Sequence, residues 1–462
     1  MAATVRYPLS VFSLVMLNVV AIDSLRSLPF AAKYGFSSVF FYIIAALLFF
    51  IPSALVAAEL ATGWPKKGGV YIWVREAFGL QAGLVTIWLQ WIYNIFWFPA
   101  ILSLLAATLA YIVNPALAHS KPFMVSAIMI MFLGTTAVNS LGVYASNWVT
   151  NIASLFGSII PMVLIVILGV VWWGSGQPVH VTFDWHHFWP HVSGLGGLVL
   201  LTNVLFSLVG MEMSAIHASE VKNPQRSYPR ALLWSIIIIL ITLIGGSLGI
   251  AMVIPQHKIA LMDGMLQMFA TFFHTFHMPW MIDVIAACII LGGFGGVTAW
   301  VLGPSKALMV AAKDGILPKW LSRQNRFHAP ISVLSVQLVI FILICGIYWY
   351  MPTVSSSFWL LSNITAILSL LAYLFMFASV IRLRYKAPEV KRPFVIPGGK
   401  VGLWLVGVAG FLVCGVVAVI GFWPPSNVEV GSVWHYEIIL VSGVIIFCII
   451  PFVLYRLCHK KN

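Results

Sequence analysis

The sequence predicts an all-α integral membrane protein with twelve transmembrane helices. Of its 462 residues, 61% are hydrophobic and only 8% are charged, whereas a soluble domain carries roughly a quarter charged residues. A soluble fold of this length could not bury so much apolar surface, because its interior grows too slowly with chain length. The apolar run at 8–32 is too long for the apolar part of a signal peptide, so we expect it to be the first span.

Twelve apolar runs come close to or exceed the length of about 20 residues that a helix needs to cross a membrane. Only short loops, and no soluble domain, are expected between them. The predicted spans cover residues 8–32, 37–62, 84–113, 122–141, 148–173, 196–220, 231–255, 278–311, 330–350, 355–382, 402–423 and 436–457.

Lysine and arginine lie almost entirely in the loops on one side of the predicted membrane. They occupy both ends of the chain and the loops after spans 2, 6, 8 and 10, whereas the opposite side has only Lys33, Lys121 and Lys258. Because cytoplasmic loops carry the excess of these residues, we expect both termini in the cytoplasm. The net charge of +13 then reflects topology and contact with the anionic lipid bilayer, and no nucleic-acid partner is expected.

Cysteine and histidine do not form a recognisable metal or disulfide site. The five cysteines lie singly in or beside apolar runs and form no CxxC pair, so we expect free buried thiols. Histidines gather in two loops on the side poor in lysine, without the spacing of metal ligands. Solvated imidazoles beside interfacial tryptophans are the simpler interpretation, and a pH-responsive loop is the alternative. The larger group comprises His180, Asp184, His186, His187 and His191.

The first predicted span contains polar residues that a membrane helix rarely carries. Asp23, Ser24, Arg26 and Ser27 lie near its middle, followed by Pro29. Proline lacks a backbone N–H and clashes with the preceding turn, so the helix should break here. Broken backbone at membrane depth persists only where it lines a cavity or is buried in protein. The alternative is that Asp23 and Arg26, three residues apart, only neutralise each other.

The sixth predicted span has a second interruption. Ser207, Leu208 and Gly210 precede Glu212 near the middle of the span, and a glycine there permits the helix to unwind. The alternative is that Gly210 only allows a close helix contact, while a protonated Glu212 bonds to a neighbouring helix.

The two interruptions fall in matching spans, the first and the sixth. Paired breaks of this kind indicate a transporter built from inverted repeats, which we place at 1–173 and 196–382, with 402–457 as two peripheral helices. The N-termini of half-helices attract a carboxylate, and their C-terminal carbonyls suit an ammonium group. A zwitterionic amino acid matches both poles, and Arg26 would add a cation beside its carboxylate or an acidic side chain.

The eighth predicted span is rich in glycine between Leu291 and Trp300. Small residues allow a close helix contact or leave room for a ligand. Trp300 is either a lid over the site or a packing residue.

Several segments, spread in order over nearly the whole chain, form a recognisable pattern. They are Ala57–Trp64 with Gly68–Val74, Gly210–Ala215, Glu220–Pro224, Tyr228–Pro229, Ala251–Pro255, Trp300–Lys306 and Phe394–Lys400. This pattern resembles the amino acid–polyamine–organocation superfamily, and within it the bacterial glutamate:GABA antiporter family.

The resemblance implies the leucine-transporter type of fold, with two inverted five-helix repeats and two peripheral helices. It implies exchange of amino acids by alternating access in the bacterial inner membrane, without a cofactor. The family's glutamate of helix 6 matches Glu212, its tryptophan of helix 8 matches Trp300, and a tyrosine of its helix 10 matches Tyr373.

Three positions depart from the glutamate:GABA antiporter pattern. An aromatic residue of helix 1 is replaced by Arg26, an acidic residue four before the helix-8 tryptophan by Gly296, and a second helix-10 tyrosine by Ser369. Because the site gains a cation and loses an anion, we expect acidic or neutral amino acids to be preferred over cationic ones.

Three modes of coupling and two roles for Glu59 are compatible with the sequence. A proton carried by Glu212, a sodium ion near Thr298 and plain exchange are all compatible with the sequence. Glu59 is expected to bond to backbone near the inner gate, or to form a cytoplasmic gate with Lys306 or a loop arginine.

Other classes of membrane protein are less well supported. An intramembrane enzyme would need a set such as HExxH or GxSxG, and neither occurs. A channel would need a continuous polar lining. A transporter-like amino acid sensor is the remaining alternative.

Overall fold

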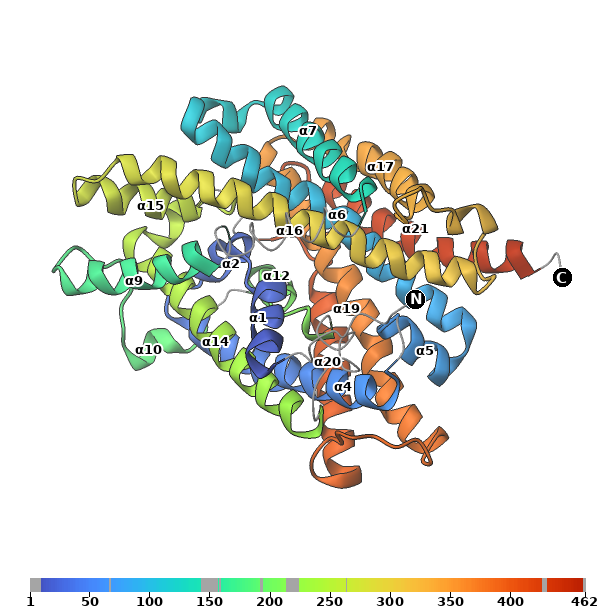
Figure 1. Ribbon diagram of the computed structural model, residues 1–462. Coiled ribbons are helices and arrows are strands. Elements are labelled where there is room, and N and C mark those ends of the chain that lie inside the picture. Colours follow the sequence, from blue (N-terminus) through green and yellow to red (C-terminus); the bar gives the residue numbers. More distant parts are fainter. Residues whose placement is uncertain are drawn as a thin grey trace.

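The computed structural model describes residues 10–65, 68–142, 157, 159–191, 194–212, 224–262, 264–425 and 430–459. Throughout these ranges the regular structure is helical (Figure 1). A helix satisfies its backbone hydrogen bonds within one segment, which lipid demands of any element that crosses it.

Most of the predicted spans are present as long helices. In the described ranges nine are long and apolar enough to cross a membrane, and a bent pair, α1 (Val11–Ile22) with α2 (Leu28–Ala32), brings the count to ten. The nine are α3–α4 (Ser37–Ala45 and Ile51–Gly63, joined by a π-helical turn), α6 (Leu80–Val113), α7 (Lys121–Ser140), α14 (Pro224–Val253), α16 (Trp280–Lys313), α17–α18 (Ile331–Cys345 and Ile347–Tyr350), α19 (Val354–Lys386), α20 (Gly399–Ile420) and α21 (Val433–His459).

The two remaining predicted spans, 148–173 and 196–220, lie partly outside the described residues. Their described parts are shorter apolar helices, α9 (Ile160–Gly174) and, for the second span, α11 (Gly194–Leu198) followed by α12 (Leu201–Phe206). The count of twelve therefore stays a prediction. Residues 150–154, which include no lysine that could take the place of a coupling sodium ion, are outside the described residues as well.

Three of the connections between the predicted spans contain short α-helices. The connection after α4 contains α5 (Val70–Phe78), the connection after α9 contains the single turn α10 (Trp185–Phe188), and the one after α14 contains α15 (Gly264–Thr275). These helices are shorter than the roughly 20 residues that a membrane span needs, so apolar runs of that length do not reveal them.

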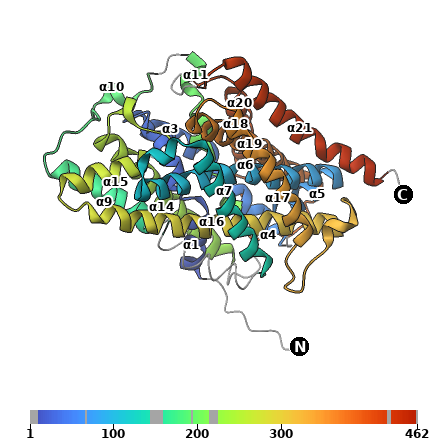
Figure 2. The same cartoon turned by 90° about the horizontal axis from the view of Figure 1, so that it is seen from above.

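The helices pack in a core with a less buried periphery. α19 and α6 contact each other extensively, α16 packs on α6, and α14 packs on both α1 and α9. The most apolar segment of α6 is 78% buried inside the protein, whereas the most apolar segment of α21 is only 17% buried. α21 runs along the outer edge of the molecule (Figure 2), and many of its apolar side chains are exposed there.

Several basic loops meet at one end of the molecule. Arg382 and Lys386, at the end of α19, donate hydrogen bonds to backbone oxygens of Ala77 and Glu76 in α5. Arg75 of α5 pairs with Asp314, directly after α16. Both views place α5 and the C-terminus at the right and α10 and α15 at the left (Figures 1 and 2). The loops after spans 2, 8 and 10 therefore share one face, as the charge pattern predicts.

Candidate binding site at two broken helices

The first broken helix separates α1 from α2. α1 ends at Ile22, Asp23 and Ser24 are extended, a 3₁₀ turn covers Leu25–Ser27, and the two halves are bent by 43°. Pro29 lies in the first turn of α2, where its missing N–H costs no hydrogen bond. The break is thus present as predicted, but it precedes the proline by several residues.

The second broken helix ends α12 at Phe206. The chain then turns, Gly210 adopts a φ of +133°, and Met211 and Glu212 are helical again. A Cβ on Gly210 would lie 3.0 Å from Cγ1 of Ile22 and 3.5 Å from the backbone oxygen of Ala21. The two breaks therefore pack directly against each other, and glycine permits both the backbone conformation and the close contact.

Tyr373 of α19 holds the second break in place. The Gly210 N–H donates to the Tyr373 hydroxyl over 3.0 Å, and that hydroxyl donates to a carboxylate oxygen of Glu212. Gln90 of α6 donates to the other oxygen of Glu212 over 3.4 Å. The Glu212 carboxylate therefore has a donor at each oxygen, although the side chain is buried.

Replacing Gly210 by alanine should disturb the contact between the two breaks. The left-handed φ is unfavourable for a residue with a Cβ, and that Cβ would press on Ile22. We expect a loss of about 1–3 kcal/mol in unfolding free energy, measured as a lower midpoint of thermal unfolding in detergent. Gly415→Ala in α20 is the control, because its Cβ would meet no atom within 4 Å. Equal midpoints for the two variants would contradict this account.

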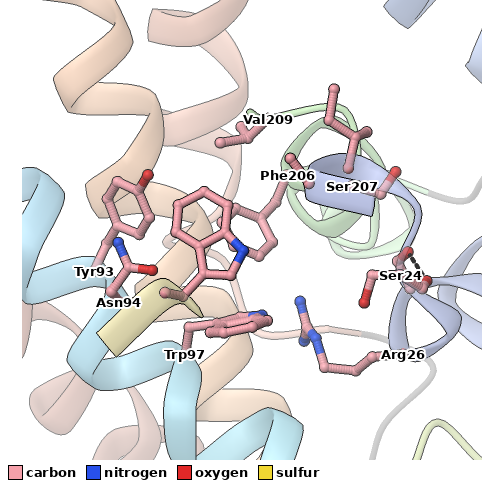
Figure 3. Close-up of a pocket in the computed structure, with 12 residues that line it drawn as sticks. Ser24, Arg26, Tyr93, Asn94, Trp97, Phe206, Ser207 and Val209 are labelled. Atoms are coloured by element: carbon pink, nitrogen blue, oxygen red, sulfur yellow. Dashed lines mark hydrogen bonds between the residues drawn. The ribbon is translucent and has the colours of Figure 1, made fainter. Parts of the chain in front are cut away.

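A small cavity, with a volume of about 40 Å³, lies beside the two breaks. Among the residues predicted for the site, five line it, contributed by the first break, the second break and α16. Figure 3 shows the side chains around it. The five are Ser24, Arg26, Ser27, Ser207 and Trp300.

One side of the cavity was missed by sequence reasoning. Tyr93, Asn94 and Trp97 of α6 line it, as do Phe206 and Val209. The available signal was an amide pair, Gln90 and Asn94, within an otherwise apolar span, because amides at membrane depth usually face the interior of the bundle.

Arg26 is a buried cation without a carboxylate partner among the described residues. It is 2% exposed, one guanidinium N–H donates to Ser362 of α19 over 2.9 Å, and its Nε has no hydrogen-bond partner. Phe206, Phe30 and Phe358 surround the guanidinium, with ring centres 5.5–6.0 Å away. Figure 3 shows the guanidinium directed into the cavity, toward Trp97 and Phe206. Burying a charge is costly unless it is paired, so the site is suited to an anion.

Asp23 does not pair with Arg26. Both Asp23 carboxyl oxygens face the Thr242 hydroxyl of α14 at 2.9 and 3.0 Å, whereas Arg26 reaches α19. The ion pairs found in the described part of the chain do not include this one. The alternative of a self-neutralising pair is therefore wrong, because the break turns the two side chains in different directions.

The other predicted residues lie near the cavity rather than in its lining. Leu208 and Gly210 are buried at the second break, and Glu212 and Tyr373 bond to each other behind it. These four residues support the second break and do not line the cavity.

A second cavity adjoins the first. It has a volume of about 70 Å³ and is also lined by Arg26, Trp97 and Trp300, together with Asp23 and Gly296. The two tryptophan rings lie 6.1 Å apart and border both spaces. A Cβ on Gly296 would meet no atom within 4 Å, so the position of the family's acidic residue is open space here.

Comparisons with known proteins agree with this architecture. The sequence profile of the amino acid permease family matches residues 9–444. The chain belongs to the amino acid permease family. An uncharacterized transporter of Legionella pneumophila is 47% identical over 443 residues, covering 96% of the permease and 95% of the relative.

Two relatives of the permease carry more specific names. A glutamate/gamma-aminobutyrate antiporter of Lactococcus lactis is 30% identical over 460 residues, covering 98% of the permease and 91% of the relative. A probable agmatine/putrescine antiporter of the same species is 24% identical over 451 residues, covering 96% and 93%. The permease is thus a membrane transporter and not an enzyme, and the resemblance found in its sequence is confirmed.

Glu59 of the permease lies in a buried ionic cluster at the end of α4. Arg384 of α19 donates to both carboxylate oxygens, over 2.8 Å in one case, and Nε of Arg392 lies 3.6 Å from Oε1. The Ile396 N–H also donates to Glu59 over 2.9 Å. For Glu59 the sequence suggested either a bond to backbone or a pair with a lysine or a loop arginine. The backbone bond and the arginine pairs are both present. Lys306 lies partly buried on α16.

The histidine-rich loop of the permease packs on itself. His186 stacks on His191 at 4.3 Å, and the His187 imidazole lies 2.7 Å from Asp184. The backbone N–H and the ring of His187 hold the pKa of Asp184 below its ordinary value. Within the described ranges, no three histidine, cysteine, aspartate or glutamate side chains are placed to bind a metal.

Proposed function

We propose that this permease is a secondary active amino acid exchanger that prefers acidic or neutral substrates. The observation that carries the proposal is Arg26, a buried guanidinium directed into a cavity between two broken helices and without a carboxylate partner in the described chain. A substrate carboxylate would supply the missing anion. Two relatives are named as antiporters, which supports exchange as the mode of transport.

The two breaks offer complementary ends to a zwitterion. The first N–H groups of a helix lack partners within the helix, so the start of the half-helix after Ser24 can donate to a carboxylate beside Arg26. The carbonyls that end α1 and α12 can accept from an ammonium group, which the negative end of a helix dipole favours. Trp97 and Trp300 would then cover the substrate from the side of α6 and α16.

Alternating access would use the two repeats at 1–173 and 196–382, with 402–457 at the periphery. In the proposed orientation both termini and the basic face around α5 lie in the cytoplasm of a bacterial cell, and the protein is in the inner membrane. The Glu59 cluster then lies at the cytoplasmic end, where it can hold α4, α19 and the loop at 387–398 together as a gate.

Selectivity follows from the charges around the cavities. Arg26 repels a cationic side chain, and Gly296 provides no carboxylate to receive one. In a site of low dielectric constant, like charges a few ångströms apart repel by several kcal/mol, enough to exclude arginine, lysine and agmatine in favour of glutamate, γ-aminobutyrate or neutral amino acids.

Counterflow in proteoliposomes tests this function. Vesicles loaded with one unlabelled amino acid should take up labelled L-glutamate or a neutral amino acid, and unlabelled arginine should compete poorly. Gly296→Glu should weaken glutamate uptake and improve competition by arginine, since the open space accepts the carboxylate. Strong competition by arginine in the unaltered protein would contradict the selectivity.

The same measurement separates the competing functions. A symporter coupled to protons or sodium would accumulate substrate in empty vesicles under the matching ion gradient, whereas an exchanger needs substrate on both sides. A transporter-like sensor would bind labelled amino acid without moving it.

A further inference from the structure

Asp23 is a buried carboxyl group at the junction of α1 and α14. It is the first residue after α1, its backbone N–H closes that helix on Val19, and it is 4% exposed. Its two carboxyl oxygens lie 3.0 and 2.9 Å from the Thr242 hydroxyl. Arg26 is occupied elsewhere, on Ser362.

Counting protons around Thr242 shows a shortage of donors. A threonine hydroxyl has one proton, yet four oxygens lie within 3.0 Å of it: the two of Asp23 and the backbone oxygens of Ile238 and Ile239. An ionised Asp23 would receive that single proton at most. A protonated Asp23 donates to the Thr242 oxygen instead, and Thr242 then donates to Ile238, so that every proton has an acceptor.

Within the described part of the chain no cation forms an ion pair with Asp23, although Arg26 lines the same cavity. The titratable groups that face it are Tyr42 of α3, whose side chain is buried, and Arg26, which donates to Ser362. On α14 the nearest titratable side chain is that of Arg230, about 18 Å from Thr242 by helical rise. α6 and α16 contribute only apolar, tryptophan and glycine residues to the cavity that Asp23 lines. A buried carboxylate without a counter-ion is costly.

The carboxylate of Glu212, in contrast to that of Asp23, has a separate hydrogen-bond donor at each oxygen. The Tyr373 hydroxyl and the Gln90 amide donate to its two oxygens, which supports the ionised form. The carboxyl that the sequence offered for proton coupling is therefore the one that its neighbours stabilise as an anion.

We propose that Asp23, rather than Glu212, is the proton-carrying residue of this permease. This inference rests on the proposed transport function. In the present conformation Asp23 holds a proton and bonds to Thr242. When α1 separates from α14 during the transport cycle, the proton passes from the carboxyl oxygen to a water molecule in the adjoining cavity and leaves a carboxylate. Rebinding of a proton lets α1 close on α14 again.

Infrared spectroscopy of the full chain in lipid tests the protonation without any substrate. At neutral pH the unaltered protein should show the C=O stretch of a neutral carboxylic acid, Asp23→Asn should lose that band, and Glu212→Gln should keep it. Thr242→Val retains the carboxyl and removes its partner, so the band should shift in frequency; this variant serves if Asp23→Asn does not fold. Loss of the band in Glu212→Gln instead would overturn the proposal.

Proton flux tests the carrying role. Proteoliposomes that contain a pH-sensitive dye should show a pH change on addition of L-glutamate, and in Asp23→Asn the change per glutamate moved should fall at least tenfold. An unchanged proton flux in Asp23→Asn, or dependence on a sodium gradient in place of a pH gradient, would overturn the proposal. A neutral-acid band without movement of any amino acid would overturn the transport function and the carrier role with it, whereas transport without the band would overturn the present proposal alone.

Discussion

Replacing Arg26 by glutamine should abolish recognition of a substrate carboxylate by this permease. Removing one partner of a buried, charge-assisted contact costs about 2–5 kcal/mol, which corresponds to roughly a 30-fold to several-thousand-fold loss of affinity. The loss would be measured as the concentration of unlabelled glutamate that halves counterflow. Arg26→Lys retains the charge but loses the planar fork of the guanidinium. Its affinity for glutamate should therefore lie between those of the unaltered protein and Arg26→Gln.

The same substitution should leave the empty protein as stable as before or more stable. Within the described chain the Arg26 guanidinium donates one hydrogen bond, to Ser362, and its Nε has no partner, so its charge is buried largely without compensation. Thermal unfolding without substrate would therefore show an equal or higher midpoint for Arg26→Gln. Unchanged glutamate affinity together with a large loss of stability would show that Arg26 is structural and not a ligand of the substrate.

Replacing Glu59 by glutamine should have the largest effect on stability. Glu59 is 1% exposed and accepts from Arg384 and the Ile396 N–H, with Arg392 nearby. Breaking a buried ion pair by removing one partner costs about 3–5 kcal/mol, because the other charge stays buried. A lower midpoint of thermal unfolding and faster proteolysis of the loop at 387–398 would be expected.

Asp314→Asn is the matched control for the Glu59 experiment. Asp314 also pairs with an arginine at the same end of the molecule, Arg75, at 2.9 Å, but its side chain is one-third exposed. A pair of this kind contributes about 1 kcal/mol or less. A loss for Glu59→Gln no greater than that for Asp314→Asn would contradict the role of burial in the Glu59 cluster.

The breaks could be predicted from sequence because their causes are local. Proline at 29, glycine at 210 and charged residues at membrane depth each disfavour a continuous apolar helix within a few positions of themselves. The direction in which Asp23 and Arg26 point could not be predicted, since a spacing of three residues brings two side chains together only on an unbroken helix.

The far side of the cavity depends on contacts between distant segments. Tyr93 and Trp97 lie in a span that is apolar on most sides, so its sequence does not tell which face turns toward α1 and α12. The short helices α5 and α15 were missed for a different reason, because a length rule for membrane spans carries no information about helices that do not cross.

α19 touches both breaks through side chains eleven positions apart. Ser362 holds Arg26 of the first break, and Tyr373 holds Gly210 and Glu212 of the second. The helix between them is uninterrupted, and its rise makes it a rod of about 16 Å between the two contacts. An anion that draws Arg26 away from Ser362 would therefore shift α19 and, with it, Tyr373 at the second break. Occupancy of the site and release of the second break would then be one cooperative event.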